Sequence, residues 1–253
     1  MSRLAYNNIF LDPTYSTVVF TDEGATFTAA QPLSNLAKMQ LPDYAQFTGE
    51  TAELDADAGA EYAVDVLALL GHTLTDGMQV EFLDGATSLG TVTVANYRGL
   101  AQNVILLLDT PVTLQTLTVS ITGGTSEAAY KIGAVWASES YKKCFAKADY
   151  GRNTASLSNV AWASATAYVD ARESQGAQNF RFTPLARADA IGPAYPNAEA
   201  VLREINESRV VLAIPYNADP AQSIYGIVES TAGPKVDAVS DRWRASVSVT
   251  EQR

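Results

Sequence analysis

The sequence has one cysteine and one histidine, and this scarcity excludes several kinds of site. Cys144 cannot form a disulfide within the chain or supply the thiolate cluster of a zinc site. His72 has no second histidine at metal-binding spacing. The nucleophile motif G-x-S-x-G and the glycine-rich phosphate-binding motifs are also missing from the sequence. We therefore expect no metal, no cofactor and no enzymatic activity.

Long apolar runs are missing as well. No stretch approaches the roughly 20 apolar residues that cross a bilayer, so we expect no membrane insertion. The first 13 residues, MSRLAYNNIFLDP, contain one arginine and no long apolar region, unlike a signal peptide. We expect a chain that is made in a cytoplasm and either stays or assembles there.

Basic residues are scarce in the first part of the chain. Residues 1–138 contain 15 acidic and 4 basic residues, whereas residues 139–253 contain 13 of each. This asymmetry accounts for the net charge of −11 and predicts two domains, 1–138 and 139–253, with different surroundings. The acidic part would repel phosphates, so we expect no nucleic-acid partner. The neutral part is the better candidate for packing against copies of itself, because like charges oppose such contacts.

Residues that favour strands and turns are abundant, with 16 glycines, 10 prolines and 12 tyrosines in a chain that is 47% hydrophobic. We therefore predict a mainly β fold of two β-sandwich domains. In the first domain, apolar or alternating runs separated by turn signals predict a sandwich. These runs are residues 9–13, 17–20, 48–54, 63–70, 78–83, 88–94, 103–108, 114–121 and 131–136.

The second domain combines strands with one predicted helix, at residues 197–208. Asn197 is a favourable N-cap, and the apolar residues that follow recur at helical spacing. Residues 157–169 predict a hairpin arm, and residues 243–250 alternate as an antiparallel strand with two different faces. Further strands are predicted at residues 179–185, 210–215 and 224–229.

Three features invite a functional interpretation. His72 follows the apolar run 63–70, where a structural histidine bonded to the backbone is favoured and a ligand contact is the alternative. The carboxylates of residues 53–61 predict a solvated acidic loop, with a Ca²⁺ site as the alternative. Tyr97, with Tyr62 or Trp136, could form a platform for a sugar, although such aromatics more often close a core.

Two segments, QPLSNL (residues 31–36) and VDVLALLGHTL (residues 64–74), resemble phage structural domains of the discoidin or galactose-binding jelly-roll type. Residues 132–137 resemble the closing strand of that family. Thr73 stands where the family commonly has asparagine, and the usual tryptophan after the first motif is missing. The resemblance implies a jelly roll over residues 1–138, with His72 and Tyr97 as candidate ligand-binding residues. The residues that match the two motifs are Pro32, Asn35, Leu36, Val64, Asp65, Leu67, Ala68, Leu69, Gly71, His72 and Leu74.

The second half resembles a tail-tube or distal-tail β-sandwich in the order of its elements: FRFTPL (residues 180–185), the helix, IYGIVES (residues 224–230) and WRASVSVTE (residues 243–251). The resemblance implies a structural virion protein, a subunit of the tail tip or baseplate of a tailed phage, whose copies form a ring through sheet edges. The expected partners are copies of itself and other tail proteins. Candidate assembly residues are Trp162, Tyr168, Phe180, Phe182 and Trp243.

Two alternatives stay open. One is a decoration protein of the phage head or neck. The other is a carbohydrate-binding adhesin that uses the loops around His72 and Tyr97 and has host surface glycans as partners. In every phage interpretation the expected location is the virion, after synthesis in the host cytoplasm.

Overall fold

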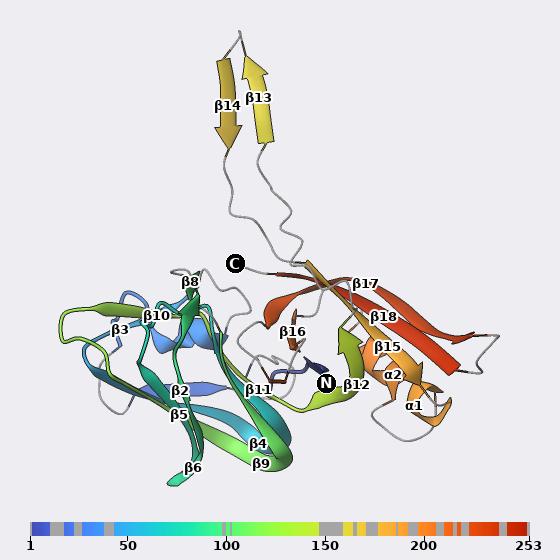
Figure 1. The fold of residues 1–253 in the computed structure, drawn as a ribbon. Helices are drawn as coiled ribbons and strands as arrows, with labels where there is room; N and C mark the ends of the chain where they lie inside the picture. Colours follow the sequence, from blue (N-terminus) through green and yellow to red (C-terminus); the bar gives the residue numbers. More distant parts are fainter. Residues whose placement is uncertain are drawn as a thin grey trace. The chain divides into compact units, whose positions relative to one another are not determined.

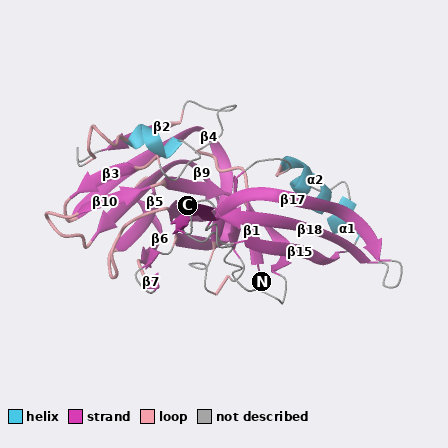
Figure 2. Cartoon of the chain, turned by 90° about the horizontal axis from the view of Figure 1, so that it is seen from above, coloured by secondary structure: helices cyan, strands magenta, loops and turns pink. Residues whose placement is uncertain are grey.

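The structure is a computed structural model of residues 1–253. It describes residues 2–10, 18–22, 27–37, 43–97, 100–101, 103–146, 159–163, 166–170, 177–185, 187–191, 197–205, 210–214, 217–218, 223–237 and 242–251. The chain divides into two compact units. The first unit contains Met1–Lys142 and Ile214–Ser223, and the second contains Lys143–Ala213 and Ile224–Arg253. Strands dominate both units, which confirms the predicted mainly β fold class (Figures 1 and 2).

The first unit contains most of the strands and the short 3-10 helix η1 (Leu33–Ala37). Its strands are β1 (Ser2–Ala5), β2 (Val19–Asp22), β3 (Ala45–Thr48), β4 (Thr51–Leu70), β5 (Gln79–Asp84), β6 (Thr87–Thr93), β7 (Asn96–Tyr97), β8 (Leu100–Ala101), β9 (Val104–Thr122), β10 (Ala129–Ile132) and β11 (Ala134–Ser138).

The main sheet of the first unit has the strand order β11-β4-β9-β5-β6, and β2 also pairs with β4. Strands β4 and β9 are 20 and 19 residues long and pair antiparallel from Thr51↔Thr122 to Leu69↔Val104. A second, two-stranded sheet is formed by β3 and β10. Buried side chains from both sheets form one hydrophobic core, in which the Phe47 and Tyr130 rings lie 5.3 Å apart.

Strand β4 changes character along its length. From Ala52 to Ala58, buried and half-exposed residues alternate, so one face packs on the core and the other faces solvent. From Val64 to Leu70 every residue is buried, as expected of a strand that is covered on both faces. The acidic residues 53–61 therefore lie within a strand, and the prediction of a loop there is wrong.

The elements from residue 140 onward are β12 (Ser140–Ala146), β13 (Asn159–Ala163), β14 (Thr166–Asp170), β15 (Ala177–Leu185), α1 (Arg187–Ile191), α2 (Ala198–Glu204), β16 (Val210–Ile214), β17 (Ile224–Asp237) and β18 (Arg242–Glu251). These strands pair in the order β12-β15-β18-β17-β16.

Strand β18 is the central strand of the second unit, because it pairs with both β15 and β17. Ala245, Val247 and Val249 are buried, whereas Ser246 and Ser248 between them are half-exposed. The predicted alternation of this strand is therefore confirmed. The helix α2 begins where predicted, with Asn197 Oδ1 accepting a hydrogen bond of 2.8 Å from Ala200 N.

Strands β13 and β14 form the hairpin predicted at residues 157–169. Their register runs from Asn159↔Asp170 to Ala163↔Thr166, so two residues connect the strands. In the described part of the chain, each of these strands pairs with the other and with no further strand (Figure 1). The hairpin is therefore a two-stranded sheet of its own.

Other predicted elements differ from the observed ones. Residues 103–108 and 114–121 are two parts of the single strand β9, and residues 131–136 are divided between β10 and β11, which belong to different sheets. Ile9 and Phe10 lie in a turn, while residues 11–13 are outside the described residues. Helix α2 ends at Glu204 with Ile205 as its C-cap, and residues 206–208 are not described. Helix α1 was not predicted.

Candidate functional site

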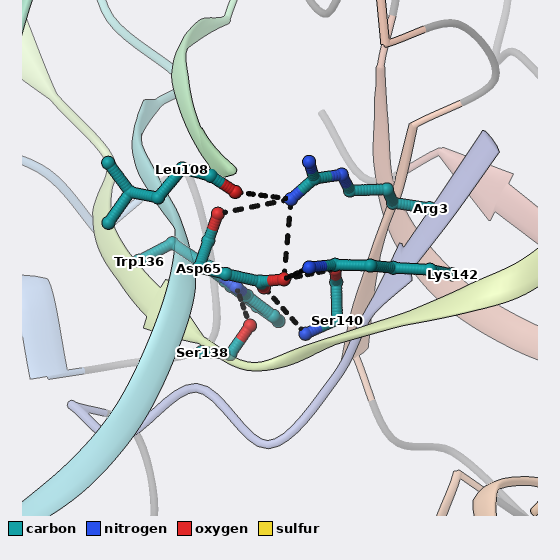
Figure 3. Close-up of polar contacts among 7 residues, drawn as sticks. All are labelled: Arg3, Asp65, Leu108, Trp136, Ser138, Ser140 and Lys142. Atoms are coloured by element: carbon teal, nitrogen blue, oxygen red, sulfur yellow. Dashed lines mark hydrogen bonds and ion pairs between the residues drawn. The ribbon is translucent and has the colours of Figure 1, made fainter. Parts of the chain in front are cut away.

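Among the described residues of the first unit, Asp65 is the centre of an extensively bonded polar site, in the buried half of β4. The residue is 0% exposed. A carboxylate without access to water needs opposite charges and hydrogen-bond donors to be tolerated in a core. Figure 3 shows that Asp65 obtains them from β1 and from the start of β12.

Both carboxylate oxygens of Asp65 have partners. Arg3 Nη1 lies 3.3 Å from Oδ2, and Lys142 Nζ lies 2.7 Å from the same oxygen. Ser140 donates its backbone N–H to Oδ1 at 2.8 Å and its hydroxyl to Oδ2 at 3.1 Å. Two cations and two neutral donors therefore compensate one buried negative charge.

Arg3 extends this site to the other long strand. Its Nη1 also donates to the backbone carbonyls of Asp65, at 3.4 Å, and of Leu108 in β9, at 3.1 Å. Close by, Trp136 Nε1 donates to Ser138 Oγ at 2.8 Å (Figure 3). Because donors of the same chain occupy the carboxylate, the arrangement suits an anchor that holds β1, β4 and the start of β12 together. We assign no catalytic step to it.

His72 lies two residues after β4 and is 4% exposed. Its Nδ1 accepts a hydrogen bond of 3.2 Å from Leu74 N. This burial and this bond to the backbone agree with the structural role that the sequence favours for His72. A role for His72 in ligand contact stays a prediction.

Tyr97 is the second residue of β7 and pairs with Leu100 of β8; its side chain is outside the described residues. The neighbouring Asn96 is described. Its backbone N–H donates to Asp76 Oδ1, and its Nδ2 donates to the carbonyl of Leu74 at 3.2 Å. Asn96 Oδ1 is buried and has no hydrogen-bond partner among the described residues. Within the described part of the chain, one acceptor beside Tyr97 is therefore unsatisfied.

The candidate assembly residues lie on three groups of strands. Trp162 and Tyr168 are in β13 and β14, where their register partners are Ala167 and Ala161. Phe180 and Phe182 are in β15, opposite Val247 and Ala245 of β18. The side chains of these four residues are outside the described residues. Trp243 of β18 is half-exposed and pairs with Leu185 and Val236.

The acidic face of β4 shows no metal site. Asp57 Oδ1 accepts hydrogen bonds from Gly59 N, at 2.7 Å, and from Gln115 Nε2, at 3.4 Å, while Asp55 Oδ1 accepts from the hydroxyl of Thr118. Among the described residues, no three histidine, cysteine, aspartate or glutamate side chains gather as metal ligands. In the same part of the chain, no helix has the length and apolarity to cross a membrane.

Comparison with known proteins gives structural likeness only. No protein-family model and no curated protein matches the chain. The lectin domain of lectinolysin, complexed with Lewis B antigen, is 11% identical, with 53% of this chain and 98% of that chain covered and a TM-score of 0.41. The fucose-binding module SpX-3 from Streptococcus pneumoniae is 10% identical, with coverage of 54% and 99% and a TM-score of 0.40.

The structure of SpGH29 is 17% identical, and the match covers 54% of this chain and 28% of SpGH29, with a TM-score of 0.41. The matched region thus spans less than a third of SpGH29. At these values the likeness assigns neither a ligand nor an activity to this chain.

Proposed function

We propose that this chain is a non-enzymatic structural protein that assembles with copies of itself, as a ring-forming subunit of the tail tip or baseplate of a tailed-phage virion. The observation that supports assembly is the hairpin β13–β14, whose strands pair with no other strand in the described part of the chain. The place in a virion rests on the order of elements in the second half and on the motif at residues 64–74.

An unsupported hairpin is a physical problem for a monomer. Two-stranded hairpins are only marginally stable in water, and no described strand pairs with either outer edge of this one. A strand of a neighbouring copy can satisfy these groups through main-chain hydrogen bonds. The surrounding residues 139–253 have 13 acidic and 13 basic residues, so no net charge of this half opposes the approach of copies. Repetition of one such contact closes a ring when the rotation between copies allows it.

The test compares the full chain with a variant in which a short Gly-Ser linker replaces residues 159–170. Light scattering over a range of concentrations and electron microscopy should show rings or regular oligomers for the full chain and monomers for the variant. As a matched control, an Asn-Gly turn at positions 164 and 165 favours the hairpin and should preserve assembly. A full chain that stays monomeric at high concentration, alone and with isolated phage tails, would contradict the proposal.

The second candidate is carbohydrate binding by the first unit, and the unsatisfied Asn96 Oδ1 beside Tyr97 is the observation that favours it. A sugar hydroxyl could donate to this oxygen while an aromatic ring stacks on the sugar. Glycan-array binding that is lost in Asn96→Ala and Tyr97→Ala, and retained in a control variant of the exposed Gln115, Gln115→Ala, would support this candidate. An array without any bound glycan would count against it.

A further inference from the structure

Strand β6 ends the main sheet of the first unit and has an open side. The sheet order β11-β4-β9-β5-β6 places β5 on one side of β6, and no described strand pairs with the other side. Thr91 and Thr93 of this strand are exposed. An edge strand of this kind presents backbone groups that another strand can bind.

The hydrogen bonds near the end of β6 show which groups point outward. Val94 N donates to the carbonyl of Met78 at 2.8 Å, on the side of β5. In an antiparallel pair, successive residues direct their N–H and C=O groups alternately toward and away from the partner strand. The N–H and C=O groups of Thr93 and Thr91 therefore face the open side.

The edge formed by β6 lacks the usual charged protection against pairing. Its sequence, TSLGTVT, contains neither a charged residue nor a proline. By contrast, β2 contains Asp22 and β10 contains Lys131. Natural edge strands commonly use charges, proline or bulges to discourage pairing. The register of β6 shifts between Ser88 and Gly90, so the protected part precedes Thr91 and leaves the last residues accessible.

We propose that the open side of β6 receives the hairpin β13–β14 of a second copy of this chain, by antiparallel or parallel strand addition. The proposal rests on the assembly function proposed above and names the surface that the hairpin binds. Among the described residues, the hairpin is one of the sheets that have only two strands, and β6 is a neutral edge strand with a strand partner on one side. In this pairing, backbone N–H and C=O groups of the hairpin would bond to the outward C=O and N–H groups of β6.

Charge and length favour this occupant. Strand β13 contains no charged residue, and β14 contains one, Asp170, at its end. The contact can therefore form without opposing charges, although the chain as a whole carries a net charge of −11. Strands of 5 residues are long enough to pair with Thr91–Thr93, the accessible end of β6. If the hairpin instead paired with β6 of its own copy, neither the hairpin edge nor the open side of β6 would be available to a neighbouring copy. The chain would then stay a monomer, contrary to the proposed assembly.

A photo-crosslinking amino acid at position 93 tests the contact in the full chain. The matched control position is Thr51, which is also an exposed threonine and lies in the same cross-strand row, Thr51↔Thr122↔Gln79↔Thr93. The two positions are three strand spacings, about 14 Å, apart. Mass spectrometry should find position 93 joined to residues 159–170 in species of dimer mass or larger, at least 10-fold more often than position 51.

A pair of substitutions tests the outward N–H itself. Thr93→Pro removes this donor and leaves the hydrogen bonds to β5 in place, because proline is tolerated where the N–H of an edge strand faces outward. We expect at least a 10-fold loss of assembled species for Thr93→Pro and no loss for Thr93→Val, which retains the N–H. Crosslinks from position 93 should disappear when residues 159–170 are replaced.

The outcomes separate this proposal from the proposed function. Crosslinks at monomer mass would place the hairpin on β6 of its own copy and overturn the inference. Rings that form equally well in Thr93→Pro, with no crosslink from position 93 to residues 159–170, would also overturn it and leave the assembly function intact. Failure of the unmodified chain to assemble would instead refute the proposed function.

Discussion

Two hairpins of similar construction have different surroundings in this protein. In β5–β6 the register closes at Asp84↔Thr87, and in β13–β14 it closes at Ala163↔Thr166, so each has two connecting residues. The first hairpin also pairs with β9, from Gln79↔Thr122 to Leu83↔Thr118. The second has no such third strand among the described residues.

This difference shows what a hairpin obtains from a third strand. Pairing with β9 allows β5 to bury Val80 and Phe82 completely, at 0% exposure, in the core of the first unit. Burial of a large apolar side chain contributes about 1.5–3 kcal/mol, which exceeds the contribution of a single hydrogen bond. A hairpin without such burial depends on a partner. The four predictions below test this contrast.

Unfolding of the first unit can be followed by the fluorescence of Trp136, which is 1% exposed. Trp162 and Trp243 are replaced by phenylalanine for this purpose, so that Trp136 is the one tryptophan left.

The largest effect is expected from Asp65→Ala, which acts on the sheet that holds β5–β6. Removal of the carboxylate leaves Arg3, whose side chain is 7% exposed, without its counter-charge. Loss of one partner of a buried ion pair costs about 3–5 kcal/mol. Denaturant unfolding followed by Trp136 fluorescence should show this loss. A decrease below about 1 kcal/mol would mean that Asp65 is not an anchor.

Phe82→Ala removes the main buried side chain of the supported hairpin. We expect a loss of about 3–4 kcal/mol in the free energy of unfolding, because the cavity adds to the lost burial. Leu83→Ala, at a half-buried position on the opposite face, is the control and should cost about 1 kcal/mol. Equal losses for the two variants would show that β5 is not held by its buried face.

Gly90→Ala should cost about 1–3 kcal/mol. Gly90 has φ 151°, and a Cβ atom there would lie 2.9 Å from Leu106 Cδ1. Gly90→Ala in a Leu106→Ala background should therefore cost less than in the unmodified chain, since the contact is absent while the backbone strain remains. A double-mutant cycle of denaturant unfolding measures the difference, and strict additivity would exclude the steric contact.

The smallest effect on stability is expected from replacement of residues 159–170 by a Gly-Ser linker. Because β13 and β14 pair with no other described strand, the unfolding free energy of the monomer should change by less than about 1 kcal/mol. The measurement is denaturant unfolding at low protein concentration, where copies do not associate. A loss as large as that of Phe82→Ala would show that the hairpin already has support within its own copy.

The sequence predicts elements better than it predicts their partners. Alternation in residues 243–250 and the apolar run 63–70 identify the strands, because burial on one face or both leaves a local pattern. The site around Asp65 has only a weak local signal, one charged residue in an apolar run. That signal predicts a cationic partner for a buried carboxylate, but it cannot select Arg3 and Lys142 among 17 basic residues.

Other parts of the structure have no local signal at all. Strand β12 contains two consecutive charged residues, Lys142 and Lys143, next to β-forming ones. Neither the start of this strand nor its pairing with β15 follows from periodicity. The two predicted strands within β9 are separated by Asp109, Thr110 and Pro111, residue types that favour a turn. Strand β9 nevertheless continues through them, and its pairing with β4 shifts register there, between Val64↔Val112 and Val66↔Leu107. In both places, contacts between residues far apart in the sequence determine that the segment is a strand.

The bonding of Asp65 also has a consequence for synthesis of the chain on the ribosome. Its partners lie on both sides in sequence: Arg3 is translated early, whereas Ser140 and Lys142 emerge about 75 residues after Asp65 itself. A nascent chain that stops before residue 140 leaves the carboxylate short of three donor contacts. We therefore expect a fragment that ends at residue 138 to fold less stably than one that ends at residue 146, although both contain all strands of the main sheet.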